Sequence, residues 1–336
     1  MTLTLLLLLH AAAEIATPGV VYQQPQLAQG PGLIAVAFGA GAKILVATSG
    51  DGAKTFGAPV LVTSDPNQPM LGRHRGPRVS ITPKAVVVTA PRGGELMAWR
   101  SMDRGKTWST GVRVNDVPGS AREGLHGTTS LPDGTLASTW LDMREKGMRL
   151  YAATSRDHGA TWTKNVQVYA SPDGHICECC HPSILADGQG HLHVMFRNWL
   201  GGARDLYLAT SIDSGRSFAA ASKLGDGTWA LNACPMDGGG LVADDGGALV
   251  TAWRRDKTIF YASPGRTERA LSEGKDPAIG ISGRDVWISW TQAGSVHFWT
   301  ATSLETKLVG PGGYPQLLGS LLAYENAGVI VIRDLK

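Results

Sequence analysis

All four cysteines of this 336-residue chain fall in two short segments, and this clustering is the most specific chemical signal in the sequence. The segment 175–181 reads His-Ile-Cys-Glu-Cys-Cys-His, and the segment 232–236 reads Asn-Ala-Cys-Pro-Met. Thiolate and imidazole groups gathered in this way suit a soft or borderline metal ion, copper or zinc, and Met236 would add a weak thioether ligand for copper. The candidate metal ligands are Cys177, Cys179, Cys180, His181, Cys234 and His126.

Two other interpretations of the cysteines stay open. In an exported protein, disulfides would join the two segments, for instance Cys234 to one cysteine of the first segment. Adjacent Cys179 and Cys180 pair with each other only under strain, so disulfides would have to link the two loops or leave free, redox-active thiols. The spacing C-x-C-C matches no common zinc module, so the pattern alone identifies no single metal.

A repeated pattern indicates which elements position these loops. Four segments follow S-x-D-x-G-x-[ST]-[FW] closely, at residues 49–56, 101–108, 155–162 and 211–218. Ser and Asp side chains accept hydrogen bonds from neighbouring backbone N–H groups, glycine permits a left-handed residue, and the final aromatic ring packs between sheets. The repeats therefore predict structural turns rather than catalytic groups.

The pattern resembles the Asp-box, or BNR repeat, of the sialidase superfamily, which lies between the two outer strands of a β-propeller blade. A strand-like run precedes each box, and two further runs that end at Ser263 and Ser303 bring the explicit units to six. More broadly, the sequence looks like a group of secreted bacterial Asp-box proteins, labelled sialidase-like, that share the C-x-C-C and C-P pair.

A seventh unit is expected near the C-terminus. Residues 314–318, Tyr-Pro-Gln-Leu-Leu, echo residues 24–28, Gln-Pro-Gln-Leu-Ala, and two more strand-like runs follow them. The outer strand that this unit lacks would come from Val20–Tyr22, which would join the two ends of the chain. We therefore expect an all-β propeller of four-stranded antiparallel blades, seven of them, with six as the alternative; sialidases as a family have six.

Composition agrees with a single toroidal domain over residues 14–336. The chain contains 43 glycines, 18 prolines and 10 tryptophans, with no heptad pattern and no long helical period. The net charge of +3 is small and the basic residues are scattered, so nucleic acid is not an expected partner. We expect a monomer that binds a glycan or another small molecule on its loop face.

The first 13 residues resemble a signal peptide. An apolar run at residues 3–9 precedes Ala11-Ala12-Ala13, which is similar to an A-x-A cleavage site. Export to a periplasm or beyond is therefore expected. The run is too short to span a bilayer, so no membrane span is predicted.

The resemblance also implies a site on the face opposite the Asp-boxes, where the loops that lead into each inner strand gather. Sialidases use a tyrosine nucleophile paired with a glutamate, an aspartate as acid/base, and an arginine triad that binds a carboxylate. The residues at similar places are Tyr314 and Glu123 as the nucleophile pair, and Arg75, Arg78, Arg197 and Arg254 as anion-binding groups. Asp276 is a further catalytic candidate, although no acidic residue matches the place of the acid/base, and Trp229, beside the second cysteine segment, is the candidate for stacking a ligand.

Three functions follow from these features. The first is a glycoside hydrolase, similar to an exo-sialidase, that acts on anionic or other glycans. The second is a copper- or zinc-binding protein or metalloenzyme that uses the Cys/His cluster, and the third is a non-catalytic propeller that binds a glycan or a protein. The F-R-I-P motif of sialidases is absent, its nearest equivalent being Gly76-Pro77-Arg78-Val79, so the resemblance covers the fold better than the active site.

Overall fold

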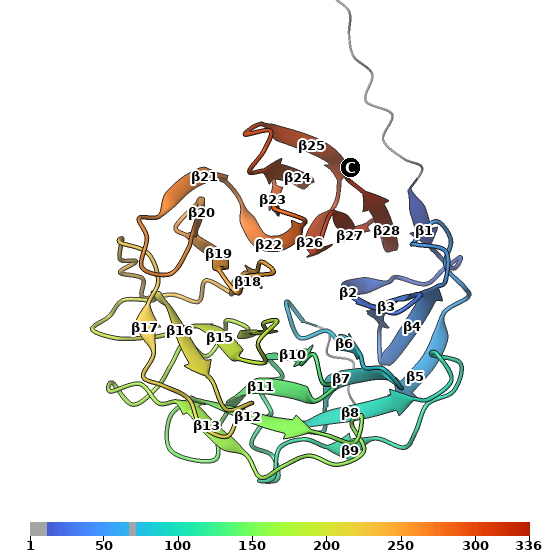
Figure 1. Cartoon of the computed structure of the whole chain (residues 1–336), viewed down its shortest axis with the longest axis horizontal. Coiled ribbons are helices and arrows are strands. Elements are labelled where there is room, and N and C mark those ends of the chain that lie inside the picture. Colours follow the sequence, from blue (N-terminus) through green and yellow to red (C-terminus); the bar gives the residue numbers. More distant parts are fainter. Residues whose placement is uncertain (1–11, 67–71) are drawn as a thin grey trace, which may run out of the picture.

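The computed structural model describes residues 12–66 and 72–336, which form a ring of seven β-sheets (Figure 1). Each sheet contains four antiparallel strands. This arrangement confirms the all-β propeller and the choice of seven blades over six. Within the described residues, no helix is long and apolar enough to cross a membrane.

The first six blades follow the chain, each built from its inner strand outward. The first blade contains β2 (Gln23–Gly30), β3 (Leu33–Ala40), β4 (Lys43–Ser49) and β5 (Val60–Ser64). The second contains β6 (Arg78–Ile81), β7 (Val86–Arg92), β8 (Glu95–Ser101) and β9 (Val112–Arg113). The third contains β10 (His126–Ser130), β11 (Leu136–Asp142), β12 (Arg149–Ser155) and β13 (Val166–Tyr169). The fourth blade contains β14 (Ser183–Ala186), β15 (Leu192–Arg197), β16 (Leu206–Ser211) and β17 (Ser222–Lys223). The fifth contains β18 (Gly239–Ala243), β19 (Leu249–Arg255), β20 (Thr258–Ala262) and β21 (Arg269–Glu273). The sixth contains β22 (Lys275–Ser282), β23 (Asp285–Gln292), β24 (Ser295–Thr300) and β25 (Thr306–Pro311).

The seventh blade combines the two ends of the described chain. It contains β26 (Gly313–Leu318), β27 (Leu321–Asn326), β28 (Val329–Asp334) and β1 (Ala13–Ile15). β1 runs antiparallel to β28, with Ala13 opposite Ile332. Of the expected leader segment, residues 1–11 lie outside the described residues, and Ala13 belongs to this outer strand.

The assignment of the outer strand to Val20–Tyr22 was wrong. Those residues form no strand and lie on the connection from β1 to β2. Tyr22 instead donates its backbone N–H to the carbonyl of Gly328 over 2.9 Å, and its buried ring packs edge-on against Phe38. Tyr22 thus packs on the first blade, whereas Val20 and Val21 are exposed, and a local strand propensity does not reveal this difference.

The Asp-boxes lie between the third and fourth strands of the first four blades, as expected. In the third box, Ser155 Oγ accepts a hydrogen bond from the Gly159 N–H over 2.9 Å, while Asp157 accepts from the backbone N–H and hydroxyl of Thr161 over 2.9 and 2.6 Å. The first box departs from the pattern because Ala53 stands at the glycine position with φ of 69°, a left-handed conformation that costs energy for a residue with a Cβ.

Large aromatic side chains fill the spaces between blades. Trp140, Trp253 and Trp290 lie on the second strands β11, β19 and β23 and are at most 2% exposed, so they are core residues. Burial of a large apolar side chain stabilises a fold by roughly 1.5–3 kcal/mol. These packed blades form the rigid frame on which the loops are mounted.

We expect Ser155→Ala to lower the free energy of unfolding by about 1–3 kcal/mol, because the buried N–H of Gly159 would lose its acceptor. Denaturant unfolding followed by tryptophan fluorescence measures the change. Ser222→Ala is the control, since Ser222 is exposed in β17 and its hydroxyl forms no hydrogen bond to the described residues; it should change stability by less than about 0.5 kcal/mol. Equal stability of both variants would contradict a structural role for the box.

Candidate functional site at the mouth of the central channel

The loops that lead into the inner strands lie on the face opposite the Asp-boxes. In the fourth blade, Leu192 pairs with Ser211 of the Asp-box, while Arg197 at the other end of β15 accepts a hydrogen bond from the N–H of Cys177. The same register applies to the other blades that carry a box. The cysteine loops and the other long loops therefore share one face.

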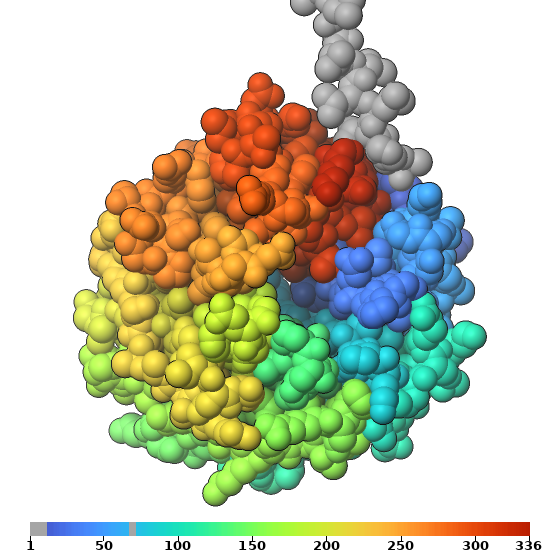
Figure 2. Space-filling model, viewed as in Figure 1, coloured from blue at the N-terminus to red at the C-terminus, as the bar shows by residue number. Residues whose placement is uncertain are grey.

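A central cavity of about 160 Å³ opens among the inner strands. Figure 2 shows the molecule hollowed near its centre, where several blades meet. The cavity is lined by polar and aliphatic residues of the inner strands, among them Gln26, Leu241 and Gln316, and, at one end, by His74, Arg78, His181 and Asp276. This end is the channel mouth on the loop face.

Several residues at the channel mouth have positive φ, a left-handed conformation that residues other than glycine rarely adopt. Gln24, Asp276 and Tyr314 each precede a proline at the bulged start of an inner strand and have φ of 54°, 53° and 51°. His74 and Met236, in the entering loops, have φ of 58° and 56°. Strained residues gathered in this way at one place are characteristic of functional sites.

His74 is the centre of the cluster. Its Nε2 lies 3.0 Å from Asp276 Oδ1, its ring stacks on His181 with centroids 4.4 Å apart, and the Tyr314 ring meets it edge-on with centroids 5.6 Å apart. No hydrogen bond to His74 Nδ1 is formed within the described residues. Burial, together with His74, holds the pKa of His181 well below its ordinary value, so His181 is a neutral ring. The pair of His74 and Asp276 has the geometry of an oriented acid/base.

A second carboxylate lies behind this pair. Asp237 Oδ2 accepts the backbone N–H of Asp276 over 3.0 Å and lies 3.2 Å from Arg254 Nε. Burial and the neighbouring Asp276 raise the pKa of Asp237, while Arg254 opposes that rise. Asp237 Oδ1 and His181 Nδ1 are buried without a hydrogen-bond partner in the described part of the chain. Such atoms call for water or a ligand.

Tyr314 faces this cluster together with two residues that the sequence analysis did not assign to the site, Arg73 and Glu325. Burial and Asp276 raise the pKa of Tyr314, and Arg73, which is exposed, opposes the rise through its charge and a hydrogen bond. Glu325 accepts the backbone N–H of Gln24 over 2.5 Å, and burial raises its pKa to about 7. Glu325 lies near the end of β27, the second strand of its blade, and that position was the signal that could have identified it.

The predicted anion-binding arginines occupy different environments. Arg78 donates to the carbonyls of His74, Gly76 and Pro77, and burial lowers its pKa to about 10. Arg197 donates to three backbone carbonyls, at Asp237, Arg204 and Arg254. Both guanidinium groups thus hold the loops in place, and of the predicted set only Arg254 contacts the central carboxylates.

The other predicted residues of the hydrolase site lie further out. Arg75 binds Glu123 through its carboxylate over 3.3 Å and its carbonyl over 2.7 Å, and no hydrogen bond or ion pair joins Glu123 to Tyr314 within the described residues. The ring of Trp229 lies beside the guanidinium groups of Arg197 and Arg254, at 5.2 and 5.6 Å. Trp229 therefore borders the centre as expected, while Glu123 does not.

The cysteines separate into a cluster and one outlier. Cys177 Sγ lies 3.7 Å from Cys179 Sγ and 3.3 Å from Cys180 Sγ, all three side chains are buried, and no disulfide joins them. Hydrogen bonds from the two neighbouring thiols, together with the charge of Arg204, lower the pKa of Cys177. Cys234 is exposed and outside this cluster.

The two predicted histidine ligands do not join the sulfur atoms. His181 stacks on His74 at the channel mouth. His126 is fully buried, with Nε2 3.1 Å from Thr89 Oγ1. Burial and the nearby Arg78 lower the pKa of His126 to about 3, so the ring is neutral. Its position at a strand start serves packing between the second and third blades.

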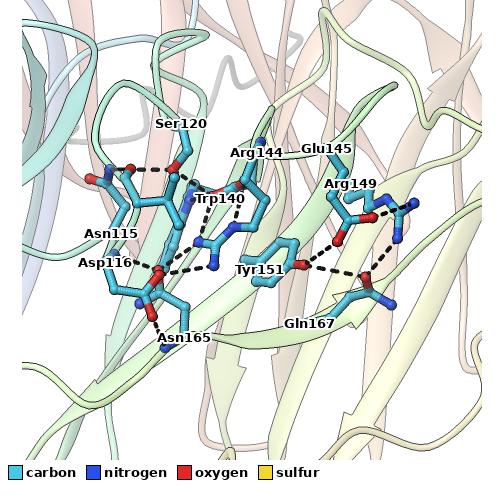
Figure 3. A network of polar contacts seen from close by, with 12 residues as sticks. Asn115, Asp116, Ser120, Trp140, Arg144, Glu145, Arg149, Tyr151, Asn165 and Gln167 are labelled. Carbon is cyan, nitrogen blue, oxygen red and sulfur yellow. Dashed lines mark hydrogen bonds and ion pairs between the residues drawn. The ribbon is translucent and has the colours of Figure 1, made fainter.

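A polar network braces the loops of the third blade (Figure 3). Arg144 binds the buried Asp142 and, over 2.9 Å, Asp116, while its guanidinium lies 3.8 Å from the centroid of the Tyr151 ring. Asp142 also accepts the indole N–H of Trp140 over 2.8 Å. Because these charges satisfy one another, the network fixes the loops and offers no group to a ligand.

Glu325→Gln should change how stability depends on pH. The pKa of Glu325 is about 7 in the folded protein and about 4.5 in the unfolded chain, so its contribution is complete below about pH 4.5 and is lost as the pH rises to about 7. The free energy of unfolding of the natural protein should therefore fall, relative to that of Glu325→Gln, by up to about 1.4 kcal/mol per pH unit in this window.

Denaturant unfolding at a series of pH values measures this difference. The exposed Glu305→Gln is the control and should track the natural protein throughout. A constant difference between Glu325→Gln and the natural protein from pH 4.5 to 8 would show that Glu325 keeps its ordinary pKa.

Among curated proteins, none matches the sequence significantly. Solved structures of the same fold include a Dyadobacter fermentans protein of unknown function, 15% identical with a TM-score of 0.57, covering 98% of this chain and 99% of that one. A Hadza microbial sialidase is 19% identical with a TM-score of 0.56, over 84% of this chain and 65% of the sialidase. An ulvan lyase is 9% identical with a TM-score of 0.62, over 93% of both chains.

At these identities the structural likeness establishes the fold and not the activity. The sequence itself gives the family, because residues 43–319 match the model described as a BNR repeat-like domain. This range begins at β4 and ends at the turn after β26, so it includes all four Asp-boxes and both cysteine loops. The chain therefore belongs to the BNR repeat-like domain family, as a seven-bladed propeller.

Proposed function

We propose that the protein is a glycan-active enzyme that hydrolyses a glycosidic bond of an anionic sugar at the channel mouth. The observation that carries this proposal is the convergence of Tyr314, His74 and Asp276 on one spot, beside buried polar atoms that lack partners in the described residues. Solved propellers of the same fold include a sialidase and an α-L-arabinanase, which supports a glycan as the substrate class.

Arg73 supports an anionic substrate. Its side chain is exposed, it lies beside Tyr314, and it forms no ion pair within the described residues. A guanidinium group binds a carboxylate through two parallel hydrogen bonds, which fixes the orientation of the sugar as well as its position. Arg254 stands on the far side of Asp237 and adds positive charge to the same region.

The residues at the mouth can divide the reaction between them. Tyr314 Oη attacks the anomeric carbon and passes its proton to Glu325, while the pair of His74 and Asp276 donates a proton to the leaving oxygen as the glycosidic bond breaks. Water then attacks the same carbon, giving one proton back to the pair, and Tyr314 recovers its own proton from Glu325. A carboxyl group with a pKa near 7 suits this exchange at neutral pH.

A second reaction, β-elimination at a uronic acid, is favoured by one observation. His74 Nδ1 has no partner in the described residues while Nε2 is held by Asp276, which is the arrangement of a general base. In this reaction His74 takes the proton next to a carboxylate bound by Arg73, and Tyr314 protonates the leaving oxygen. One solved neighbour of this fold is an ulvan lyase.

Tyr314→Phe should reduce kcat/KM by about 10²–10⁴-fold in either reaction, since it removes the nucleophile or the acid. Fluorogenic anionic glycosides and uronate polysaccharides are suitable substrates; new reducing ends without an ultraviolet-absorbing product indicate hydrolysis, and an unsaturated product indicates elimination. Tyr261→Phe is the matched control, because Tyr261 is also partly exposed but packs against Trp299 in the outer part of its blades. Turnover that survives in Tyr314→Phe would refute the proposed site.

A further inference from the structure

The sulfur cluster lies next to the channel mouth but takes no part in the proposed reaction. Cys177, Cys179 and Cys180 are 1%, 7% and 2% exposed, and among the described residues Met236 is the partly buried hydrophobic side chain that packs against their cluster. The three Sγ atoms all lie within 4.8 Å of one another. Three buried sulfur atoms with a thioether beside them, and no imidazole or carboxylate among them, form a donor set suited to soft metal ions.

The separations fit a metal ion at their centre. A trigonal ion with metal–sulfur distances of about 2.3 Å places its sulfur ligands about 4 Å apart. The sulfur atoms of Cys177 and Cys179 are 3.7 Å apart, and those of Cys177 and Cys180 are 3.3 Å apart. An ion therefore needs these pairs of sulfur atoms to separate by about 0.3 and 0.7 Å, respectively. Both separations are far longer than a disulfide bond of about 2.05 Å.

Two buried arginines supply the electrostatic argument. Arg204 is 8% exposed, donates from Nη1 to Cys177 Sγ over 3.0 Å, and lies 4.0 Å from the centroid of the Trp199 ring. Arg197 is 1% exposed and its charge acts on Cys180. Within the described residues, neither guanidinium group forms an ion pair with a carboxylate. Buried cations of this kind need anionic partners, and the nearby thiols are the groups that can become anionic.

We infer that Cys177, Cys179 and Cys180 bind one monovalent copper ion as thiolates. Three thiolates and one Cu(I) carry a charge of −2, which the two arginines neutralise, whereas Zn(II) in the same site would leave an excess positive charge. Cu(I) also accepts three ligands and soft sulfur, while Zn(II) prefers four ligands. Each thiol that becomes a ligand releases its proton to solvent, so affinity should rise with pH.

The test is Cu(I) uptake by the full chain, purified without oxygen and stripped with a chelator. Titration against a Cu(I)-specific chromophoric chelator, with elemental analysis after desalting, should give one copper per chain. X-ray absorption of the loaded natural protein should show a shell of sulfur neighbours at about 2.2–2.3 Å. This spectroscopic measurement needs no variant and therefore does not depend on how a mutant folds.

Variants then assign the ligands. Cys177→Ser and Cys180→Ser should each lose the stoichiometric copper, whereas Cys234→Ser, which alters the exposed cysteine outside the cluster, should keep it. Arg204→Met keeps an apolar stem against Trp199 but removes the charge, and it should weaken Cu(I) binding by about tenfold or more. The exposed Arg216→Met is its control and should bind as the natural protein does.

Three results would overturn the inference. The first is a reduced natural protein that takes up no copper, and the second is a metal shell of nitrogen or oxygen. The third is a site that holds one Zn(II) that Cu(I) does not displace, which would make zinc the ion. A Cys177–Cys180 disulfide that persists in the freshly purified protein, with no copper bound after its reduction, would identify the cluster as a thiol pair instead.

Discussion

Backbone pairing between Ala13–Ile15 and Ile330–Ile332 is the interaction on which the remaining structure depends. A propeller blade is a small sheet that cannot bury both of its faces alone, so the first and last blades need a firm junction. The pairing gives the last blade its fourth strand from the opposite end of the chain. It also places Tyr314 and Glu325, which belong to that blade, against the first and second blades.

Hydrogen bonds at the channel mouth extend this junction. Gln24 donates its backbone N–H to Glu325 of the seventh blade, and its side chain binds the loop of the second blade at Gly72 and Gly76. That loop carries Arg73 and His74 into the centre. The ring closure and the placement of the proposed acid/base groups are therefore two parts of one set of contacts.

Unbalanced buried charge distinguishes the functional regions from the rest of the loop face. In the third blade, Arg144 and its carboxylates satisfy one another, so the network is structural. At the mouth, buried polar atoms of Asp237 and His181 have no partner in the described chain, and beside it the buried Arg204 donates to a thiol and forms no ion pair with a carboxylate of the described residues. Unpaired groups of this kind are costly to maintain. Water, a sugar or a metal ion that binds these groups would supply the missing partner and so offset this cost.

The sequence by itself determined the all-β fold, the Asp-box turns and the seven units, because each depends on local hydrogen bonding or on a period in the chain. It also placed Tyr314, Asp276 and the cysteine loops on one face. Only the tertiary structure assigned roles within that face. Arg73 and His74 come from one loop and Glu325 comes from β27, more than 240 residues later, and their association depends on the curvature of the ring.

The tertiary structure also decided the position of the outer strand and the partners of the arginines. The strand Ala13–Ile15 is three residues long and has no pattern of its own, and its pairing is decided by where β28 leaves an open edge. Arg78 and Arg197 have the residue type expected of anion-binding groups, yet nearby carbonyls occupy them. Residue type indicates what a side chain can bind, whereas the folded surroundings decide which partner is within reach.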